Sequence, residues 1–263
     1  MKRYALLALT VALAGLAQPA QGQSQAQRGD KWVVSWTASA HGPYPVGNPS
    51  AQPDQKFAFP TPEAGARDQT FRLVLRPDIW GKQLRLRLTN VFGTRPVNFD
   101  GVFAGLQLGS AVLVKGTNRP VTFGGKDRIT LAPGAMAWSD PVSLPFVRNA
   151  DELTGRKLAV SFHVDGESGP MTWHAKAMQT SYVSAPGSGS LGKAEDEAAF
   201  PNSTASWFFL DAVGHIDDDA VAEAGANPLL HYLRSGRAEG RPIRLACARD
   251  AQARVIETRP IVL

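Results

Sequence analysis

The sequence predicts an all-β protein, an antiparallel sandwich or jelly roll, followed by a short helical tail. Glycine and proline number 25 and 19 among 263 residues, a proportion typical of short strands joined by many turns. Apolar residues make up 43 % of the chain and charged residues 19 %, as in folded proteins. Apolar and polar residues alternate with a period of two. A parallel sheet is disfavoured, because each of its crossovers needs a helix of about a dozen residues.

The first 22 residues have the pattern of a secretory signal peptide. Lys2 and Arg3 precede the apolar stretch 4–17, and Ala20 and Gly22 would occupy the −3 and −1 positions of a cleavage site. Residues 23–30 would then form a leader, and we expect the mature protein to be secreted, into the periplasm or outside the cell. A buried N-terminal helix is the alternative. No other apolar run approaches the ~18 residues of a membrane span, so no stable membrane insertion is expected after cleavage.

Ten segments between residues 31 and 213 carry the strand pattern. In Gln83–Leu88 the leucines face one way and the arginines the other, as in a half-buried strand. Turn-forming clusters such as Gly124-Gly125-Lys126-Asp127 and Ser139-Asp140-Pro141, where Asp140 should cap a turn, separate the segments. The predicted strands are Lys31–Trp36, Thr70–Leu75, Gln83–Leu88, Val102–Leu108, Val121–Phe123, Ile129–Leu131, Val142–Phe146, Leu158–Val164, Thr180–Val183 and Ser206–Leu210.

Two long insertions interrupt this pattern. His41–Arg67 contains six prolines and offers Tyr44, Phe57 and Phe59 as anchors, which predicts an ordered loop wrapped on the domain. Ala185–Pro201 runs through a Gly-Ser repeat into an acidic patch, and we expect it to be disordered over residues 185–198.

The charge balance argues against a nucleic-acid partner. The formal net charge of +5 falls to +3 when Lys2 and Arg3 leave with the signal peptide, whereas nucleic-acid binding needs basic residues clustered on one face. Several basic residues alternate with leucine and are expected on the solvated face of a sheet, with a groove for an acidic polymer as the alternative. They are Arg72, Arg76, Lys82, Arg85 and Arg87.

Eight segments occur in a fixed order along residues 31–213: Trp32–Ser39, Asp68–Arg72, Arg85–Gly93, Arg119–Gly125, Trp138–Val142, Thr172–Ala175, Thr180–Val183 and Ser206–Val213. Together they resemble the N-terminal β-domain that precedes the catalytic domain in bacterial secreted SGNH hydrolases, also called GDSL esterases or lipases. The resemblance covers about two-thirds of the chain.

This resemblance implies that full-length relatives hydrolyse carboxylic esters with a serine nucleophile in a Gly-Asp-Ser block and a base in an Asp-x-x-His pair. Neither block occurs in this sequence. Gly225-Ala226-Asn227 has the spacing of an oxyanion block, but Pro228 stands where the family has aspartate. We therefore expect a chain truncated before the serine block, with no catalytic residue of its own.

Tryptophans and histidines are the candidate ligand-binding residues, because exposed indoles can stack on sugar rings, although most tryptophans pack in cores. Trp80 should be the most exposed, Trp32 and Trp36 should share one face of the first strand, and His163 should be a surface or half-buried strand residue. The candidate set is Trp80, Trp173, His174 and His41. For His174, a structural hydrogen bond to a loop carbonyl is favoured over general-base work. With Cys247 the single cysteine and no zinc-like spacing of ligands, neither a disulfide, a metal nor a cofactor is expected.

Residues 214–263 differ in composition, with seven arginines, no lysine and seven acidic residues. Asn227–Arg234 predicts a short amphipathic helix with Pro228 in its first turn. Asn227–Arg241 resembles a short helical repeat of bacterial polysaccharide synthesis and export proteins. A fused module and a docking segment are alternatives to truncation or rearrangement, which is favoured.

The sequence thus predicts a secreted accessory domain of an SGNH/GDSL-type esterase, non-catalytic in this chain, with a polysaccharide or acylated substrate as its partner. It leaves the oligomeric state open. One alternative is a stand-alone carbohydrate-binding module, which would present a row of exposed aromatic rings. The other is a hydrolase with an unrecognised site, in which His174 or His41 would meet a carboxylate in a cleft.

Overall fold

The computed structural model describes residues 31–45 and 55–217, and their regular structure is antiparallel β-sheet apart from two single-turn 3-10 helices, η1 (Pro62–Ala64) and η2 (Asp151–Leu153). The predicted all-β antiparallel fold is confirmed. Within these ranges, no helix has the length and apolar character needed to cross a membrane. The predicted signal peptide, the leader and the tail helix lie outside the described residues.

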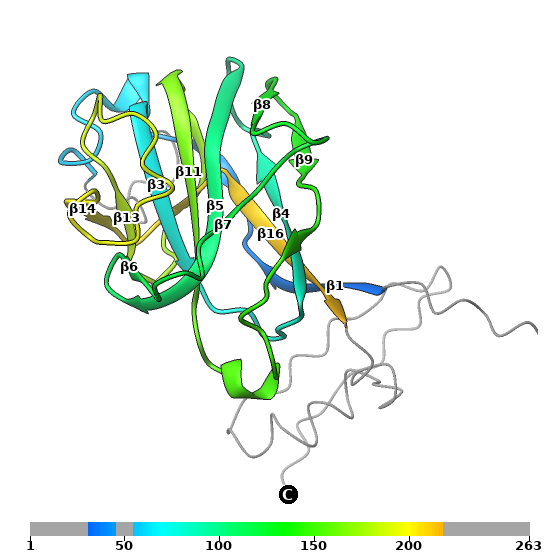
Figure 1. Cartoon of the computed structure of the whole chain (residues 1–263). Coiled ribbons are helices and arrows are strands. Elements are labelled where there is room, and N and C mark those ends of the chain that lie inside the picture. Colours follow the sequence, from blue (N-terminus) through cyan, green and yellow to red (C-terminus); the bar gives the residue numbers. More distant parts are fainter. Residues whose placement is uncertain (1–30, 46–54, 218–263) are drawn as a thin grey trace, which may run out of the picture.

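Two curled sheets carry most of the strands (Figure 1). The large sheet has the order β14 (Asn202–Thr204), β13 (Ser181–Val183), β3 (Arg67–Leu75), β11 (Leu158–Glu167), β5 (Val97–Gly109) and β6 (Val112–Leu113), and β5 also pairs with β7 (Arg119–Pro120) and β8 (Arg128–Leu131). The second sheet has the order β1 (Lys31–Thr37), β16 (Leu210–Asp217), β4 (Gln83–Thr89) and β10 (Val142–Ser143), with β9 (Met136–Trp138) also paired to β4.

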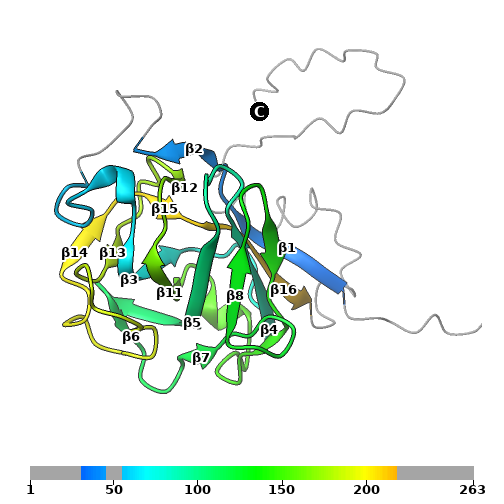
Figure 2. The same cartoon turned by 90° about the horizontal axis from the view of Figure 1, so that it is seen from above.

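A small third sheet lies across one end of the domain, as the view from above shows (Figure 2). It joins β15 (Trp207–Phe208), β12 (Met171–His174) and β2 (His41–Tyr44). The sequence analysis expected one strand over Ser206–Leu210, but the backbone of Phe209 has a φ of 55°, and the chain changes sheets there, from β15 to β16. β16 then continues past the predicted domain end at Val213.

The hydrophobic core lies between the two larger sheets. The leucines of β4 are buried, and the residues that alternate with them, Gln83, Arg85 and Arg87, are half-buried, as the period-two pattern predicts. From the large sheet, Phe71 packs with its ring centroid 5.2 Å from that of Phe162 and 5.4 Å from that of Phe208. Such aromatic pairs each add about 0.5–1.5 kcal/mol beyond the burial of their area.

Asp140 caps a turn, but it is the turn before β8 and not the Ser139-Asp140-Pro141 segment in which the sequence places it. Asp140 accepts hydrogen bonds from the backbone N–H groups of Gly124 (3.0 Å) and Gly125 (2.8 Å), and the bond from Gly125 is the main reason why the pKa of Asp140 is lowered. The strand predicted over Val121–Phe123 is wrong, because a turn closed by an isolated bridge between Phe123 and Lys126 occupies its end.

The segment 185–201 is ordered and covers the outer face of the large sheet, so the disorder expected over 185–198 is wrong (Figure 1). Arg72 holds it there, donating to the carbonyl oxygen of Ala194 and, on the sheet side, to Ser161 Oγ at 2.9 Å. Thr70 Oγ1 donates to the carbonyl of Gly189 at 2.7 Å. Arg72 is fully buried, which contradicts its expected place on a solvated face. Its guanidinium satisfies the carbonyl oxygens of the segment above it.

The other insertion follows its prediction in part. Residues 46–54 lie outside the described ranges, and residues 55–67 fold onto the domain. Tyr44 and Phe59 are the buried anchors that the sequence analysis expected, with ring centroids 5.5 Å apart, whereas Phe57 is 87 % exposed and anchors nothing.

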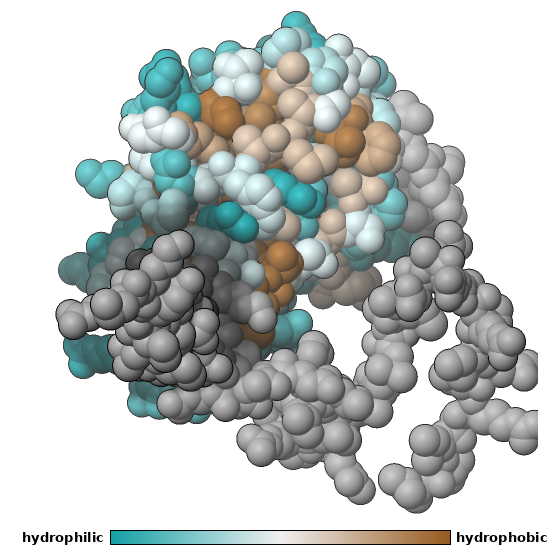
Figure 3. Space-filling model, turned by 90° about the vertical axis from the view of Figure 1, so that its right-hand side faces the viewer, coloured by the Kyte–Doolittle hydropathy of each residue, from teal (hydrophilic) through white to brown (hydrophobic). Residues whose placement is uncertain are grey.

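Cations and indoles stack on the outer face of the second sheet. The guanidinium carbon of Arg85 lies 4.6 Å from the ring centroids of both Trp32 and Trp138. Trp36 does not share this face with Trp32, because a β-bulge between Val34 and Trp36 redirects the later side chain. Figure 3 shows the right-hand side of the view in Figure 1, where hydrophobic and hydrophilic patches lie side by side.

Candidate functional site

Three of the four candidate ligand-binding residues lie together in the small sheet. The rings of His41 and His174 stack with centroids 5.0 Å apart, and Trp173 is buried beside them with its Nε1 donating to the carbonyl of Gly42 at 2.9 Å. His174 Nδ1 donates to the carbonyl of Ser39 at 2.7 Å, so the predicted hydrogen bond to a loop carbonyl is confirmed. The cavity beside these residues measures about 10 Å³, room for about one water molecule.

Trp80 lies elsewhere and is buried, so its expected exposure is wrong. Its turn folds back against β16, where a side chain at Gly81 would collide with the carbonyl oxygen of Ile216 at 2.0 Å. The indole, 4 % exposed, packs between Phe146 and His215. Its Nε1 has no hydrogen-bond partner among the described residues.

One serine–histidine contact exists in the core, between β1 and β16. Ser35 Oγ lies 2.7 Å from His215 Nδ1 and 3.2 Å from the carbonyl oxygen of Val213. Burial lowers the pKa of His215 to about 4, so the imidazole is neutral at pH 7. Nucleophilic catalysis needs a hydroxyl that substrate can reach and a third group that orients the base. Both side chains are buried, and Trp80 occupies the place beside the ring.

A second histidine forms a cluster that the sequence analysis missed. His163 is 4 % exposed, so the expected surface or half-buried position is wrong. Its Nδ1 and Nε2 each lie 2.8 Å from a carboxylate oxygen, of Asp100 and Asp68 respectively. Both nitrogens are therefore occupied, and the ring has no free nitrogen to take a proton from a serine. The cluster ties β11 to β5 and to the start of β3. The three residues meet because of the register in which β11 pairs with β3 and β5, and residue types alone do not reveal that register.

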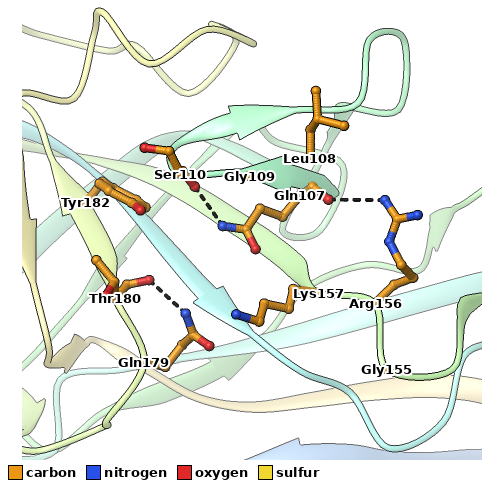
Figure 4. Close-up of a pocket in the computed structure, with 10 residues that line it drawn as sticks. All are labelled: Gln107, Leu108, Gly109, Ser110, Gly155, Arg156, Lys157, Gln179, Thr180 and Tyr182. Carbon is orange, nitrogen blue, oxygen red and sulfur yellow. Dashed lines mark hydrogen bonds between the residues drawn. The ribbon is translucent and has the colours of Figure 1, made fainter.

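A polar groove of about 420 Å³ lies at one end of the large sheet (Figure 4). Its walls come from β5, β13 and the chain that leads into β11. Tyr182 is in register with Arg72, so its side chain stands on the outer face of the sheet. The turn at Gly155, with a φ of 78°, brings Arg156 and Lys157 to the groove. The Gln107 N–H donates to the carbonyl of Lys157 at 2.9 Å and fixes the wall.

Apart from Leu108, the side chains that line the groove are polar or charged hydrogen-bonding groups. Figure 4 shows the Lys157 ammonium directed into the space beside Gln179. Within the part of the chain that the structure describes, the Lys157 ammonium and the Tyr182 hydroxyl make no hydrogen bond or ion pair. The amides are held by the backbone, with Gln107 Nε2 donating to the Ser110 carbonyl at 2.6 Å. The groove can therefore offer a ligand the positive charge of Lys157 and the hydroxyl group of Tyr182 as a hydrogen-bonding partner.

Sequence reasoning did not single out any of these groove residues. Gln107 and Lys157 are neighbours only through the β5–β11 register, and Tyr182 joins them through β13 and β3.

No group of three or more His, Cys, Asp or Glu side chains in residues 31–45 and 55–217 is placed to hold a metal ion. No protein-family model matches this chain, and no curated protein matches it significantly.

Proposed function

We propose that this chain is a secreted accessory domain that binds and positions a polysaccharide or an acylated saccharide and does not itself hydrolyse esters. The relation to SGNH/GDSL-type esterases rests on the sequence resemblance, and the sandwich or jelly-roll form rests on the pattern of short strands and turns. The observation that carries the binding role is the groove of Figure 4, because its amide, hydroxyl and cationic groups match the hydrogen-bonding groups of a sugar.

The surroundings of the histidines support a non-catalytic role. Acyl transfer requires a reachable hydroxyl, a base with a free nitrogen and a group that orients the base. His215 meets Ser35 only inside the core, and His163 has both nitrogens engaged by carboxylates. His41 and His174 contact each other and backbone atoms, which gives no support to the alternative in which either one meets a carboxylate.

The purified chain should show no turnover of a chromogenic acetyl ester above the buffer rate. The reason is that the serine–histidine contact described above, Ser35–His215, is buried and cannot deliver an activated hydroxyl to a substrate. Hydrolysis is followed by release of the chromophore at pH 7–8, alongside the variants S35A and H174A. A rate above background that disappears in H174A would place an active site in the small sheet and overturn the proposal. A rate above background that disappears in S35A would also overturn the proposal, because it would show that Ser35 and His215 are catalytic.

A further inference from the structure

We infer that the groove selects saccharides that carry carboxylate groups, with Lys157 pairing to the carboxylate. This inference rests on the proposed function, since it names the class of saccharide that the same groove would take. The selectivity follows from the charge of the walls, the freedom of the cation and the rigidity of the strands that present it.

The charge of the groove has one sign. Arg156 and Lys157 are its only ionisable lining residues apart from the Tyr182 phenol, and none of the ten lining residues is acidic. An anionic ligand would thus meet attraction without a compensating repulsion from the walls. A neutral sugar would gain hydrogen bonds in the same place but no ion pair.

Lys157 is free to make that ion pair. Its side chain is half-buried, and its ammonium has no acidic partner among the described residues. Arg156 is more exposed, and its guanidinium makes one long contact, 3.4 Å to the carbonyl oxygen of Gln107. The half-buried cation gives the stronger interaction, because water screens a partly enclosed charge less than an exposed one.

The remaining groups are those that recognise sugar hydroxyls. Gln179 Nε2 donates to the backbone carbonyl of Thr180 at 3.1 Å, which leaves the Gln179 carbonyl oxygen as an acceptor facing the groove (Figure 4). Tyr182 supplies a hydroxyl and the edge of an aromatic ring. Two cations beside two amides suit one charged sugar with several hydroxyls better than a nucleic-acid backbone, which needs a longer row of cations.

The groove is preorganised, which lowers the cost of binding. The backbone of Gln107 in β5 is hydrogen-bonded to that of Lys157, the residue before β11, and β11 pairs over long registers with β5 on one side and β3 on the other. The next residues, Leu106 and Leu158, are paired and buried in the core. The backbone that carries these groups therefore needs little ordering when the ligand binds.

The test compares oligogalacturonate with its methyl ester, which has the same sugars but no carboxylate charge. Titration calorimetry at low salt should show the acid bound roughly fivefold more tightly than the ester, as expected of one partly exposed, charge-assisted contact. K157Q should remove this preference while keeping the ester affinity. K126Q removes the same charge from an exposed turn that does not line the groove, and it should keep the preference.

Each other outcome has a distinct meaning. Equal binding of acid and ester by the unmodified chain would overturn the carboxylate selectivity and leave the proposed saccharide binding intact. Binding of neither would overturn both. A preference that survives in K157Q would overturn the pairing of the carboxylate with Lys157, because Arg156 also lines the groove. Equally tight binding of polyglutamate would overturn the saccharide class, because it would show that any polyanion suffices. Thermal unfolding of K157Q confirms that the variant is folded.

Discussion

Replacing Arg72 by methionine is expected to lower the free energy of unfolding by about 3 kcal/mol. Hydrogen bonds from a charged donor contribute about 1.5–3 kcal/mol each, and leaving buried carbonyl oxygens without a donor adds a desolvation cost. Arg72 makes several such bonds, to Ser161 Oγ and to the carbonyls of Ala111 and Ala194. Burial lowers its pKa to about 10, so the side chain is still charged at pH 7.

Urea denaturation of R72M against the unmodified chain measures the loss. R76M is the matched control, since Arg76 follows the same strand but is exposed, and its effect should stay within about 0.5 kcal/mol. Hydrogen exchange adds a local readout. The Leu191 N–H, which donates to Thr70 Oγ1, should lose protection in R72M because the segment 185–201 is no longer held on the sheet. An R72M variant as stable as R76M would mean that the segment is held by other contacts.

The strands whose pattern is local could be predicted from the sequence. β4 alternates between buried and half-buried residues, because only one of its faces is buried. β3 and β11 are buried on both faces over seven consecutive residues, and their apolar-rich runs between turn clusters indicate strands. The strands of the small sheet other than β15, and the short partners β6, β7, β9 and β14, were missed. They have two to four residues each, too few to show a period. The eight-residue strand β16 was also missed beyond its first residue, Leu210.

The site could not be predicted for a different reason, because its residues meet through pairing between distant strands. Lys157 faces the groove with Gln107 only because β5 and β11 pair antiparallel in one particular register. The predictions about Trp36 and Trp80 were wrong because of local backbone geometry. A bulge separates Trp36 from Trp32, and a turn packed on β16 buries Trp80. Residue type alone does not determine whether a given indole is buried or exposed, because these details of the backbone decide it.

The largest pH effect expected for this fold comes from His215. Its pKa is about 4 in the folded chain and about 6.5 when the chain unfolds. Between these values the unfolded state binds more protons, so the stability is complete above pH 6.5 and falls as the pH drops toward 4. A shift of this size corresponds to a loss on the order of 3 kcal/mol at pH 4. The cause is local, because protonation would place a charged N–H at Nε2, which has no partner among the described residues.

Urea denaturation at pH 7, 6, 5 and 4 measures this fall, and H215Q isolates its source. Glutamine can still hydrogen-bond to Ser35 but carries no titrating group, so the H215Q curve should be nearly flat between pH 6.5 and 5. H41Q, which replaces an exposed histidine, should keep the full fall. The carboxylates cannot mimic the effect over pH 6.5–5, because unperturbed carboxyl groups titrate near pH 4. If H215Q loses stability as steeply as the unmodified chain over that interval, another buried group must take up the proton.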